Sequence, residues 1–247
     1  MYSREYFEGD FRCGHEGSYF SNETLDHIVD DQLLHRIKEY KPGGRFLEVG
    51  CAGGAFLDAA RTAGYEVQGV EYSDIAAEFA RRNFNLDVRT GRLEQVQFPP
   101  DSFDVVFMGD VLEHLPDPGV TMKELNRIMR NGGLIVILCP MQTNTLFSRA
   151  GFLVYQILGR KTTVHLPPYH LFEYRPNSLT GLVVKCGFRV TKITESIIPP
   201  SEIAQRGSLV QKNAKKLFQY PNYVVTKLFG KLGDRVEMFA TKERGVL

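Results

Sequence analysis

Apolar and polar positions along this chain follow two alternating periods. Short apolar runs bounded by glycine, proline or charged residues predict buried strands at 46–49, 66–72, 103–108 and 134–139. Between the runs, apolar residues recur every three or four positions, which predicts helices over 55–63, 74–82 and 120–129. Strands that alternate with helices in this way indicate right-handed βαβ units and a mostly parallel sheet.

The flanking segments add further elements. Apolar spacing predicts a helix over 24–40 that the sequence "KPGG" ends, and Ser73 is the expected N-cap of the helix over 74–82. We also expect a strand at 86–90, a turn at 131–133, a helix at 178–186 and strands at 188–193 and 236–241. The absence of repeats and of linker-like composition predicts one domain over 1–247. Its parts are a lid and helix (1–40), a cofactor-binding core (41–140), a substrate-side insertion (141–176) and a C-terminal part with a basic amphipathic helix (177–247).

Composition narrows the functional classes only slightly. The formal net charge is +1, so nothing global argues for a nucleic-acid partner. The four cysteines are far apart, with no zinc spacing, and no metal ligands are predicted. Reduced thiols and a start without a signal-peptide pattern favour a cytoplasmic location. The longest apolar stretch, "GFLVYQILG" at 151–159, is too short to span a bilayer.

The segment "RFLEVGCAGGAF", residues 45–56, carries the first chemical signal. Gly50, Gly53 and Gly54 follow a strand and open a helix, so backbone amides there can meet a ligand. Glu71 ends the next strand, where a carboxylate can accept hydrogen bonds from ribose hydroxyls. Glu48 lies inside the first strand, where an ionised carboxylate is costly without a partner.

Two classes of cofactor remain compatible with the glycine turn. A nicotinamide enzyme favours GxGxxG beside a pyrophosphate, but Ala52 replaces the second glycine, and Glu48 does not suit a dianion. Glu48 does suit a cofactor that carries an ammonium group and a sulfonium. The balance therefore favours S-adenosylmethionine, while a structural ion pair is the alternative role for Glu48 and Glu71.

Four motifs in this order resemble a known family: "FLEVGCAGG", "VQGVEYS", "FPPDSFDVVFMGDVLEHLPDP" and "LNRIMRNGGLIVILCP". Over roughly residues 1–193 the chain resembles class I S-adenosylmethionine-dependent methyltransferases. The resemblance is strongest to the bacterial branch of ubiquinone-pathway O-methyltransferases and methyltransferases of surface-glycan synthesis. It implies an α/β, Rossmann-like, seven-stranded and mostly parallel sheet, with helices on both faces and an antiparallel last strand.

The resemblance also implies a set of cofactor contacts. Arg92 departs from the family, which commonly has an acidic residue there, so adenine contacts are expected from the backbone of Arg92 and Leu93. An N-cap is the alternative role for Asp110, and Cys51 is expected to be a small filler and not a nucleophile. The predicted cofactor-binding residues are Glu48, Gly50, Cys51, Gly53, Glu71, Tyr72, Arg92, Leu93, Gly109 and Asp110.

Histidines are the candidates for accepting a proton from an acceptor hydroxyl, because imidazole titrates near neutrality. His170 lies in "PYHL", which matches a pattern of the resembled family, and is the first candidate catalytic residue. His114 in "LEHLP" is the second, and His165 is a weaker candidate. Structural hydrogen bonding for His170, packing within its turn for His114 and surface exposure for His165 are the alternatives.

Two further segments bear on the substrate. Tyr6, Phe7, Tyr19 and Phe20 are expected either to close over the cofactor as a lid or to pack against the sheet. Residues 201–247 are basic, with apolar residues such as Leu217 and Phe218 interleaved. Such a helix either packs on its sheet or contacts an anionic membrane face, which would favour a lipid-linked acceptor.

The sequence therefore predicts an S-adenosylmethionine-dependent methyltransferase. O-methylation of a small metabolite, a sugar or a lipid-linked intermediate by direct in-line transfer is the expected reaction. The alternatives are a catalytically silent cofactor-binding partner subunit and a nicotinamide-dependent oxidoreductase. The sequence does not determine the acceptor or the oligomeric state.

Overall fold

The computed structural model describes residues 20, 29–160, 170–200 and 209–243. Within these ranges, seven strands form one sheet in the order β3-β2-β1-β4-β5-β7-β6. Neighbouring strands are parallel from β3 to β5, while β7 is antiparallel to both β5 and β6. The strands are β1 (Arg45–Val49), β2 (Glu66–Glu71), β3 (Val88–Thr90), β4 (Phe103–Gly109), β5 (Met129–Pro140), β6 (Phe188–Ser196) and β7 (Arg235–Lys242). The predicted fold class is confirmed.

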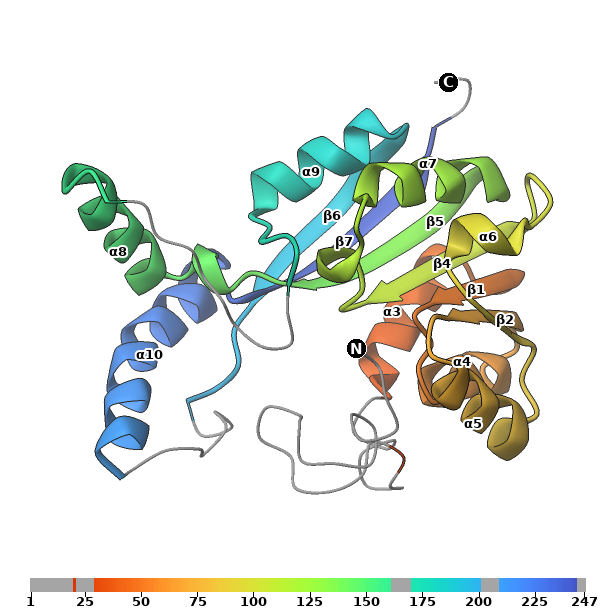
Figure 1. The fold of residues 1–247 in the computed structure, drawn as a ribbon, viewed down its shortest axis with the longest axis horizontal. Coiled ribbons are helices and arrows are strands. Elements are labelled where there is room, and N and C mark those ends of the chain that lie inside the picture. Colours follow the sequence, from red (N-terminus) through yellow and green to blue (C-terminus); the bar gives the residue numbers. More distant parts are fainter. Residues whose placement is uncertain (1–19, 21–28, 161–169, 201–208, 244–247) are drawn as a thin grey trace.

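Helices cover both faces of this sheet, as Figure 1 shows. One layer contains α3 (Asp31–Tyr40), α4 (Ala55–Thr62) and α5 (Asp74–Phe84). The other contains α6 (Leu93–Val96), α7 (Pro118–Ile128) and α9 (Pro176–Lys185). The 3-10 turns η1 (Leu112–His114) and η2 (Gln142–Asn144) follow β4 and β5. Two helices, α8 (Leu146–Ile157) and α10 (Leu209–Phe229), lie beyond the carboxyl end of strand β5 and project away from both layers (Figure 1).

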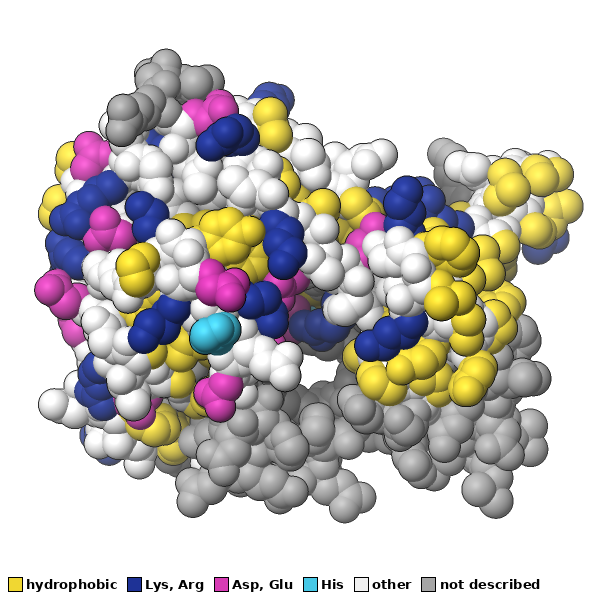
Figure 2. Space-filling model, turned by 180° about the vertical axis from the view of Figure 1, so that it is seen from behind, with side chains coloured by type: hydrophobic (Ala, Val, Ile, Leu, Met, Phe, Trp, Pro, Cys, Tyr) yellow, Lys and Arg dark blue, Asp and Glu magenta, His cyan; other side chains and the backbone are white. Residues whose placement is uncertain are grey.

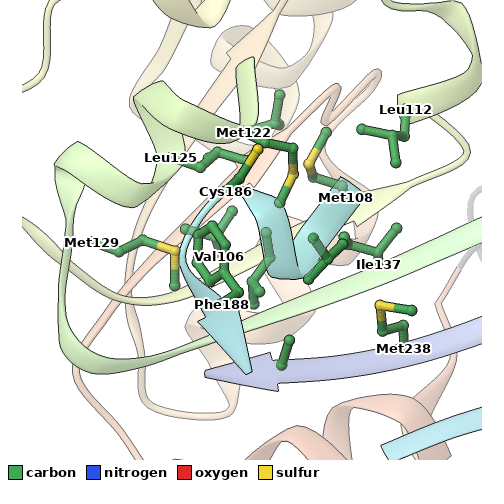
Figure 3. Packing of buried hydrophobic residues seen from close by; sticks show 14 of the residues in the cluster. Val106, Met108, Leu112, Met122, Leu125, Met129, Ile137, Cys186, Phe188 and Met238 are labelled. Atoms are coloured by element: carbon green, nitrogen blue, oxygen red, sulfur yellow. The ribbon is translucent and has the colours of Figure 1, made fainter. Parts of the chain in front are cut away.

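Each face of the sheet has its own hydrophobic core, because successive strand side chains point to opposite faces. Val106 and Met108 of β4 pack under α7 and α9, together with Leu125 and Phe188 (Figure 3). Val105 and Phe107 of the same strand pack on the opposite side. Parallel strands covered on both faces are apolar at most positions, which explains why "FDVVFM" has one polar residue, Asp104, and no polar alternation.

Side-chain caps decide where several helices begin. The Ser73 hydroxyl accepts from the Ala76 amide at 3.4 Å, so the predicted N-cap of α5 is confirmed. The Asp117 carboxylate caps α7 through the Val120 amide at 3.1 Å. The expectation of a helix from residue 24 is wrong at residues 29 and 30, which are not helical. Asp30 instead caps α3 by accepting from the Leu33 amide at 2.8 Å.

The expected turn at 131–133 is also wrong. These residues lie within β5, where the register with β4 shifts: Phe103 pairs with Met129, but Val105 pairs with Leu134. Gly132 adopts φ 73°, a left-handed conformation that glycine reaches without steric cost. The sequence "NGG" therefore forms a bulge that bends one continuous strand.

The sheet order reverses direction between β1 and β4. The chain runs outward from β1 to β3 and then crosses back to β4 on the other side of β1. Connections that diverge from two adjacent strands leave a crevice at the carboxyl ends of those strands. Gly50 after β1 and Asp110 after β4 therefore flank the natural ligand position.

The helices α8 and α10 are joined at one end by a buried amide. Asn222 of α10 accepts from the Leu146 amide at 2.7 Å and donates to the Leu232 carbonyl at 2.9 Å. No residue of α8 is buried, although this helix is mostly apolar. None of the described helices is long and apolar enough to cross a membrane.

Candidate functional site

The glycine turn after β1 brings the backbone close to the neighbouring loop. Gly50 adopts φ 76°, and a Cβ atom at this position would lie 2.4 Å from Cγ2 of Val111. Gly54 adopts φ 85° and begins α4, where a Cβ would lie 2.9 Å from that of Ala80. Ala52 is also left-handed, at φ 46°. The turn is therefore held in a shape that suits glycine at two positions and strains alanine at a third.

Glu71 holds the glycine turn and the next helix together. One carboxylate oxygen accepts from the Ala52 amide at 2.8 Å, and the other accepts from the Ser73 amide at 2.8 Å. Burial raises the pKa of Glu71, and these backbone hydrogen bonds lower it. Each carboxylate oxygen keeps a further lone pair that can accept from a hydroxyl group. Glu71 thus positions the turn in addition to offering acceptors to a ribose.

Glu48 lies beside Glu71 and is almost fully enclosed. Its residue is 6% exposed, and its Oε2 atom has no hydrogen-bond partner among the described residues. Burial first, and the neighbouring Glu71 second, raise the pKa of Glu48 well above its usual value. None of the ion pairs within the described part of the chain includes either residue, so the structural ion pair is not the arrangement seen there.

The enclosed carboxylate provides a test of whether the cofactor fits. A buried carboxylate oxygen without a partner is costly, and a bound cation that also donates hydrogen bonds would remove this cost. The ammonium group of an S-adenosylmethionine amino-acid moiety has this chemistry, whereas a pyrophosphate would add repulsion. Glu48, Glu71 and the glycine turn together therefore fit this cofactor.

The other predicted residues of the turn are small and enclosed. Cys51 is 4% exposed, and Gly53 is buried. Burial, Glu48 and Glu71 together raise the pKa of the Cys51 thiol well above its usual value, so its thiol is held protonated. This agrees with the expected role as a filler, because the thiolate is the nucleophilic form.

The predicted adenine side is more open. Tyr72 is 58% exposed, and the Arg92 guanidinium lies 5.9 Å from the centroid of its ring. The backbone amide of Arg92 donates to Oε1 of Gln95 at 3.3 Å, so this amide already has an acceptor. Leu93 begins α6, where helix geometry leaves the amide without an intrahelical acceptor. Of the two predicted backbone contacts, Leu93 is the better placed to meet an adenine nitrogen.

Asp110 forms an ion pair that the sequence did not predict. Both of its carboxylate oxygens lie 2.6 Å from Nη2 of Arg235, at the start of β7. The alternative role as an N-cap is wrong, because Val111 occupies that position before η1. Gly109 ends β4 in register with Leu138 of β5. These two predicted residues therefore lie at the mouth of the crevice, next to the turn after β1.

The two candidate catalytic histidines come together, although they are far apart in the sequence. The rings of His114 and His170 lie 5.0 Å apart, edge to face. The backbone carbonyl of Glu113 accepts from the Leu171 and Phe172 amides at 2.8 and 3.1 Å. These hydrogen bonds join η1 to the segment that follows His170. His165, the third candidate, lies outside the described residues.

Two carboxylates beside these histidines were missed at the sequence level. Glu113 is 1% exposed, and burial, followed by the charge of Asp110, raises its pKa to about 8. Glu173 lies 3.3 Å from Nδ1 of His170 and has one buried oxygen without a partner in the described part of the chain. Their sequence signals were adjacency to His114 and an (i, i+3) spacing from His170.

Of the four aromatic residues in the expected lid, the structure describes only Phe20. Phe20 stacks on Phe79 of α5, with ring centroids 4.2 Å apart and planes at 15°. Tyr6, Phe7 and Tyr19 lie outside the described residues, so the lid stays a prediction.

Comparisons with known proteins agree with this geometry. Residues 47–137, from β1 into β5, match the profile of a family described as a methyltransferase domain. A Mycolicibacterium smegmatis protein named "Probable S-adenosylmethionine-dependent methyltransferase" is 30% identical over 164 residues, which cover 66% of this chain and 57% of that protein. Residues 47–137 form a methyltransferase domain, and the chain is similar to S-adenosylmethionine-dependent methyltransferases. The resemblance stated from the four motifs is confirmed.

Two further proteins extend the comparison. The ubiquinone biosynthesis O-methyltransferase of Albidiferax ferrireducens is 27% identical over 186 residues, covering 70% of this chain and 67% of that protein. The crystal structure of a methyltransferase from Archaeoglobus fulgidus superimposes with a TM-score of 0.60 at 21% identity, covering 96% of this chain and 97% of the other. This structure supports the fold alone. The chain spans about half the length of the first curated relatives that it matches.

The buried Glu48 carboxyl makes a prediction about stability that needs no ligand. Its raised pKa means that the folded protein keeps this proton at pH values where the unfolded chain has lost it. Stability is therefore lost as pH rises from about 4.5 toward the folded pKa, with a slope of up to about 1.4 kcal/mol per pH unit. Urea unfolding from pH 5 to 8 should show a smaller slope in Glu48→Gln than in the parent protein, because only the contribution of Glu48 is lost. Glu71 and Glu113, whose pKa values burial also raises, keep their own contributions.

The matched control for this measurement is Glu66→Gln, at an exposed position of β2. This variant should keep the pH dependence of the parent protein, because an exposed carboxylate remains hydrated. If Glu48→Gln also keeps that pH dependence, the described burial of Glu48 is wrong.

Proposed function

We propose that the protein transfers a methyl group from S-adenosylmethionine to a hydroxyl of a small metabolite, a sugar or a lipid-linked intermediate. The observation that carries the proposal is the enclosed Oε2 of Glu48, which lacks a partner among the described residues and lies beside Glu71 in the crevice. A methylated cofactor with an ammonium group and a ribose satisfies both carboxylates. When bound, it supplies an activated methyl group on a sulfonium.

The protein's own residues have three tasks in this reaction. Glu48 and Glu71 hold the two ends of the cofactor, and Gly50 allows the close approach of its backbone. The acceptor must lie on the side opposite the sulfur, about 3 Å from the methyl carbon, for in-line displacement. The carbon–oxygen bond forms as the carbon–sulfur bond breaks, and the hydroxyl proton must leave the acceptor.

The paired histidines support a hydroxyl acceptor. His114 follows β4 and His170 lies within the insertion 141–176, and the backbone of Glu113 joins these two segments at the carboxyl end of the sheet. Imidazole beside carboxylates is suited to proton removal near neutral pH. The relative from Albidiferax ferrireducens, named as a ubiquinone biosynthesis O-methyltransferase, is consistent with oxygen as the methylated atom.

Cofactor affinity provides the direct test of the proposal. Glu71→Ala should weaken binding of S-adenosylhomocysteine by about 1–3 kcal/mol, because the ribose hydroxyls and the Ala52 amide lose their acceptor. Isothermal titration calorimetry measures this loss, and Glu66→Ala on the exposed start of β2 is the control. Unchanged affinity in Glu71→Ala would show that the ribose lies elsewhere. No binding to the parent protein at millimolar concentration would refute the proposal.

Turnover separates the enzyme from a silent cofactor-binding subunit. His170→Ala should lower kcat on a hydroxyl acceptor by about 10²–10⁴-fold, while S-adenosylhomocysteine affinity stays within twofold (about 0.4 kcal/mol) of the parent value. His35→Ala, at an exposed position of α3, should leave both quantities unchanged. A fall of less than tenfold in His170→Ala would assign His170 a structural role. Cofactor binding without turnover across a broad acceptor screen would favour the silent subunit.

The projecting helices favour a lipid-linked acceptor within this proposal. The last turn of α10 exposes Leu228 and Phe229 at 72% and 70%, and α8 exposes Ile157 at 74%. Figure 2 shows apolar side chains gathered at this end of the molecule. The sequence of α10 contains four lysines and no acidic residue, which complements an anionic lipid surface. Contact with the anionic face of a membrane is the proposed role of this surface.

Vesicle binding tests that surface. The parent protein should cosediment with phosphatidylglycerol vesicles at low salt and release from them at high salt, because lysine attraction is screened. Leu228→Glu combined with Phe229→Glu should reduce the bound fraction at least about tenfold by removing apolar contacts and adding negative charge. Val184→Glu, at an exposed apolar position of α9, is the control. Equal binding to neutral phosphatidylcholine vesicles, or none to either, would contradict the proposal.

A further inference from the structure

Three side chains at the acceptor side of the crevice have the composition of a metal-binding site. Glu113, His114 and His170 each offer a ligand atom, and these atoms all lie within 4.8 Å of one another. Oε1 of Glu113 and Nε2 of His114 lie 3.8 Å apart. Tetrahedral ligands with bonds of about 2.1 Å lie about 3.4 Å apart, so small side-chain rotations would bring the three atoms to that distance.

A second observation points to a ligand at this position. Oε1 of Glu113, the same atom that faces His114, is buried and has no hydrogen-bond partner among the described residues. The Glu113 side chain is 1% exposed, so solvent does not replace the missing partner. A buried carboxylate oxygen without a partner is costly, and a cation bound between it and the two imidazoles would remove this cost.

The surroundings of His170 have the arrangement that metal-binding histidines commonly show. Nδ1 of His170 lies 3.3 Å from Oε1 of Glu173. In the tautomer that carries its hydrogen on Nδ1, His170 can donate a hydrogen bond to this carboxylate oxygen. A histidine that donates through Nδ1 keeps the lone pair of Nε2 for a ligand, and such a carboxylate partner orients the ring. Glu173 also places a second carboxyl group beside the site.

The local charges favour a cation as well. Arg235, the basic residue near this group, is already paired with both oxygens of Asp110. That guanidinium is therefore engaged by Asp110. Apart from the two histidines themselves, no ion pair among the described residues places a protein cation on Glu113 or Glu173.

We propose that Glu113, His114 and His170 form a binding site for a divalent transition-metal ion, with Zn²⁺ as the best-matched ion. Two imidazoles and one carboxylate are a donor set that binds Zn²⁺ and leaves a fourth position open. This site departs from the sequence prediction that the chain has no metal ligands. It does not depend on the proposed methyl transfer. With a metal bound, His170 would be a ligand, and the cation, in place of a free imidazole, would lower the pKa of an acceptor hydroxyl bound at its open position.

Metal binding by the full chain tests the inference without any measurement of activity. Protein treated with EDTA and dialysed should bind one equivalent of Zn²⁺ in competition with a chromophoric chelator. Co²⁺ should bind at the same stoichiometry and show visible absorption. Glu113→Gln and His170→Ala should each lower Zn²⁺ affinity more than about 100-fold. Glu173→Gln should lower it about 10–100-fold, the usual effect of removing a carboxylate that orients a ligand.

Controls separate this outcome from misfolding and from adventitious binding. His35→Ala removes an exposed histidine next to Glu39 and should keep the parent affinity. Circular dichroism and S-adenosylhomocysteine titration of each variant report folding and the neighbouring site. Loss of Zn²⁺ binding with intact cofactor binding supports the inference. One-equivalent binding that persists in both Glu113→Gln and His170→Ala, or no binding by the parent protein, would overturn it. The cofactor titration fails independently if the proposed function is wrong.

Discussion

The arrangement of the site depends on two carboxyl groups that are enclosed where the sheet reverses its order. β1 has β2 on one side and β4 on the other, so the loops after these strands diverge and leave a crevice. Glu48 and Glu71 lie in that crevice, one with an oxygen that lacks a partner among the described residues and the other bound to two backbone amides. Two neighbouring buried carboxylates raise the cost of ionising either one, and a bound cation lowers that cost.

This constraint also explains the geometry of the glycine turn. Glu71 accepts from the Ala52 amide, which holds Ala52 at a positive φ that alanine rarely adopts. Val111, from the loop after β4, packs against Gly50 so closely that a larger residue would displace it. The turn after β1, the end of β2 and the loop after β4 therefore form one unit. A change in any of them alters the cofactor position.

A second enclosed carboxylate organises the acceptor side. The backbone carbonyl of Glu113 accepts hydrogen bonds from two amides of the segment after His170, while its side chain lies beside His114. The same residue thus connects the loop after β4 to the insertion and places a buried carboxyl group beside the two histidines. Glu48 and Glu113 each have a buried carboxyl oxygen without a partner among the described residues, so a bound cation at either position would stabilise the fold.

Local patterns in the sequence determined the core of the fold. Neighbouring residues in the chain determine the mostly apolar run of β4 and the cap at Ser73. The sequence alone also placed Glu48 just before a glycine turn. Tertiary contacts decided the rest. Asp110 meets Arg235 across 125 positions, and His114 meets His170 only because η1 binds the returning insertion. The sequence "NGG" became a bulge because β5 extends past it to pair with β4. Local propensity is a property of a few consecutive residues, whereas these pairings depend on which distant strands become neighbours, and only the folded sheet defines that.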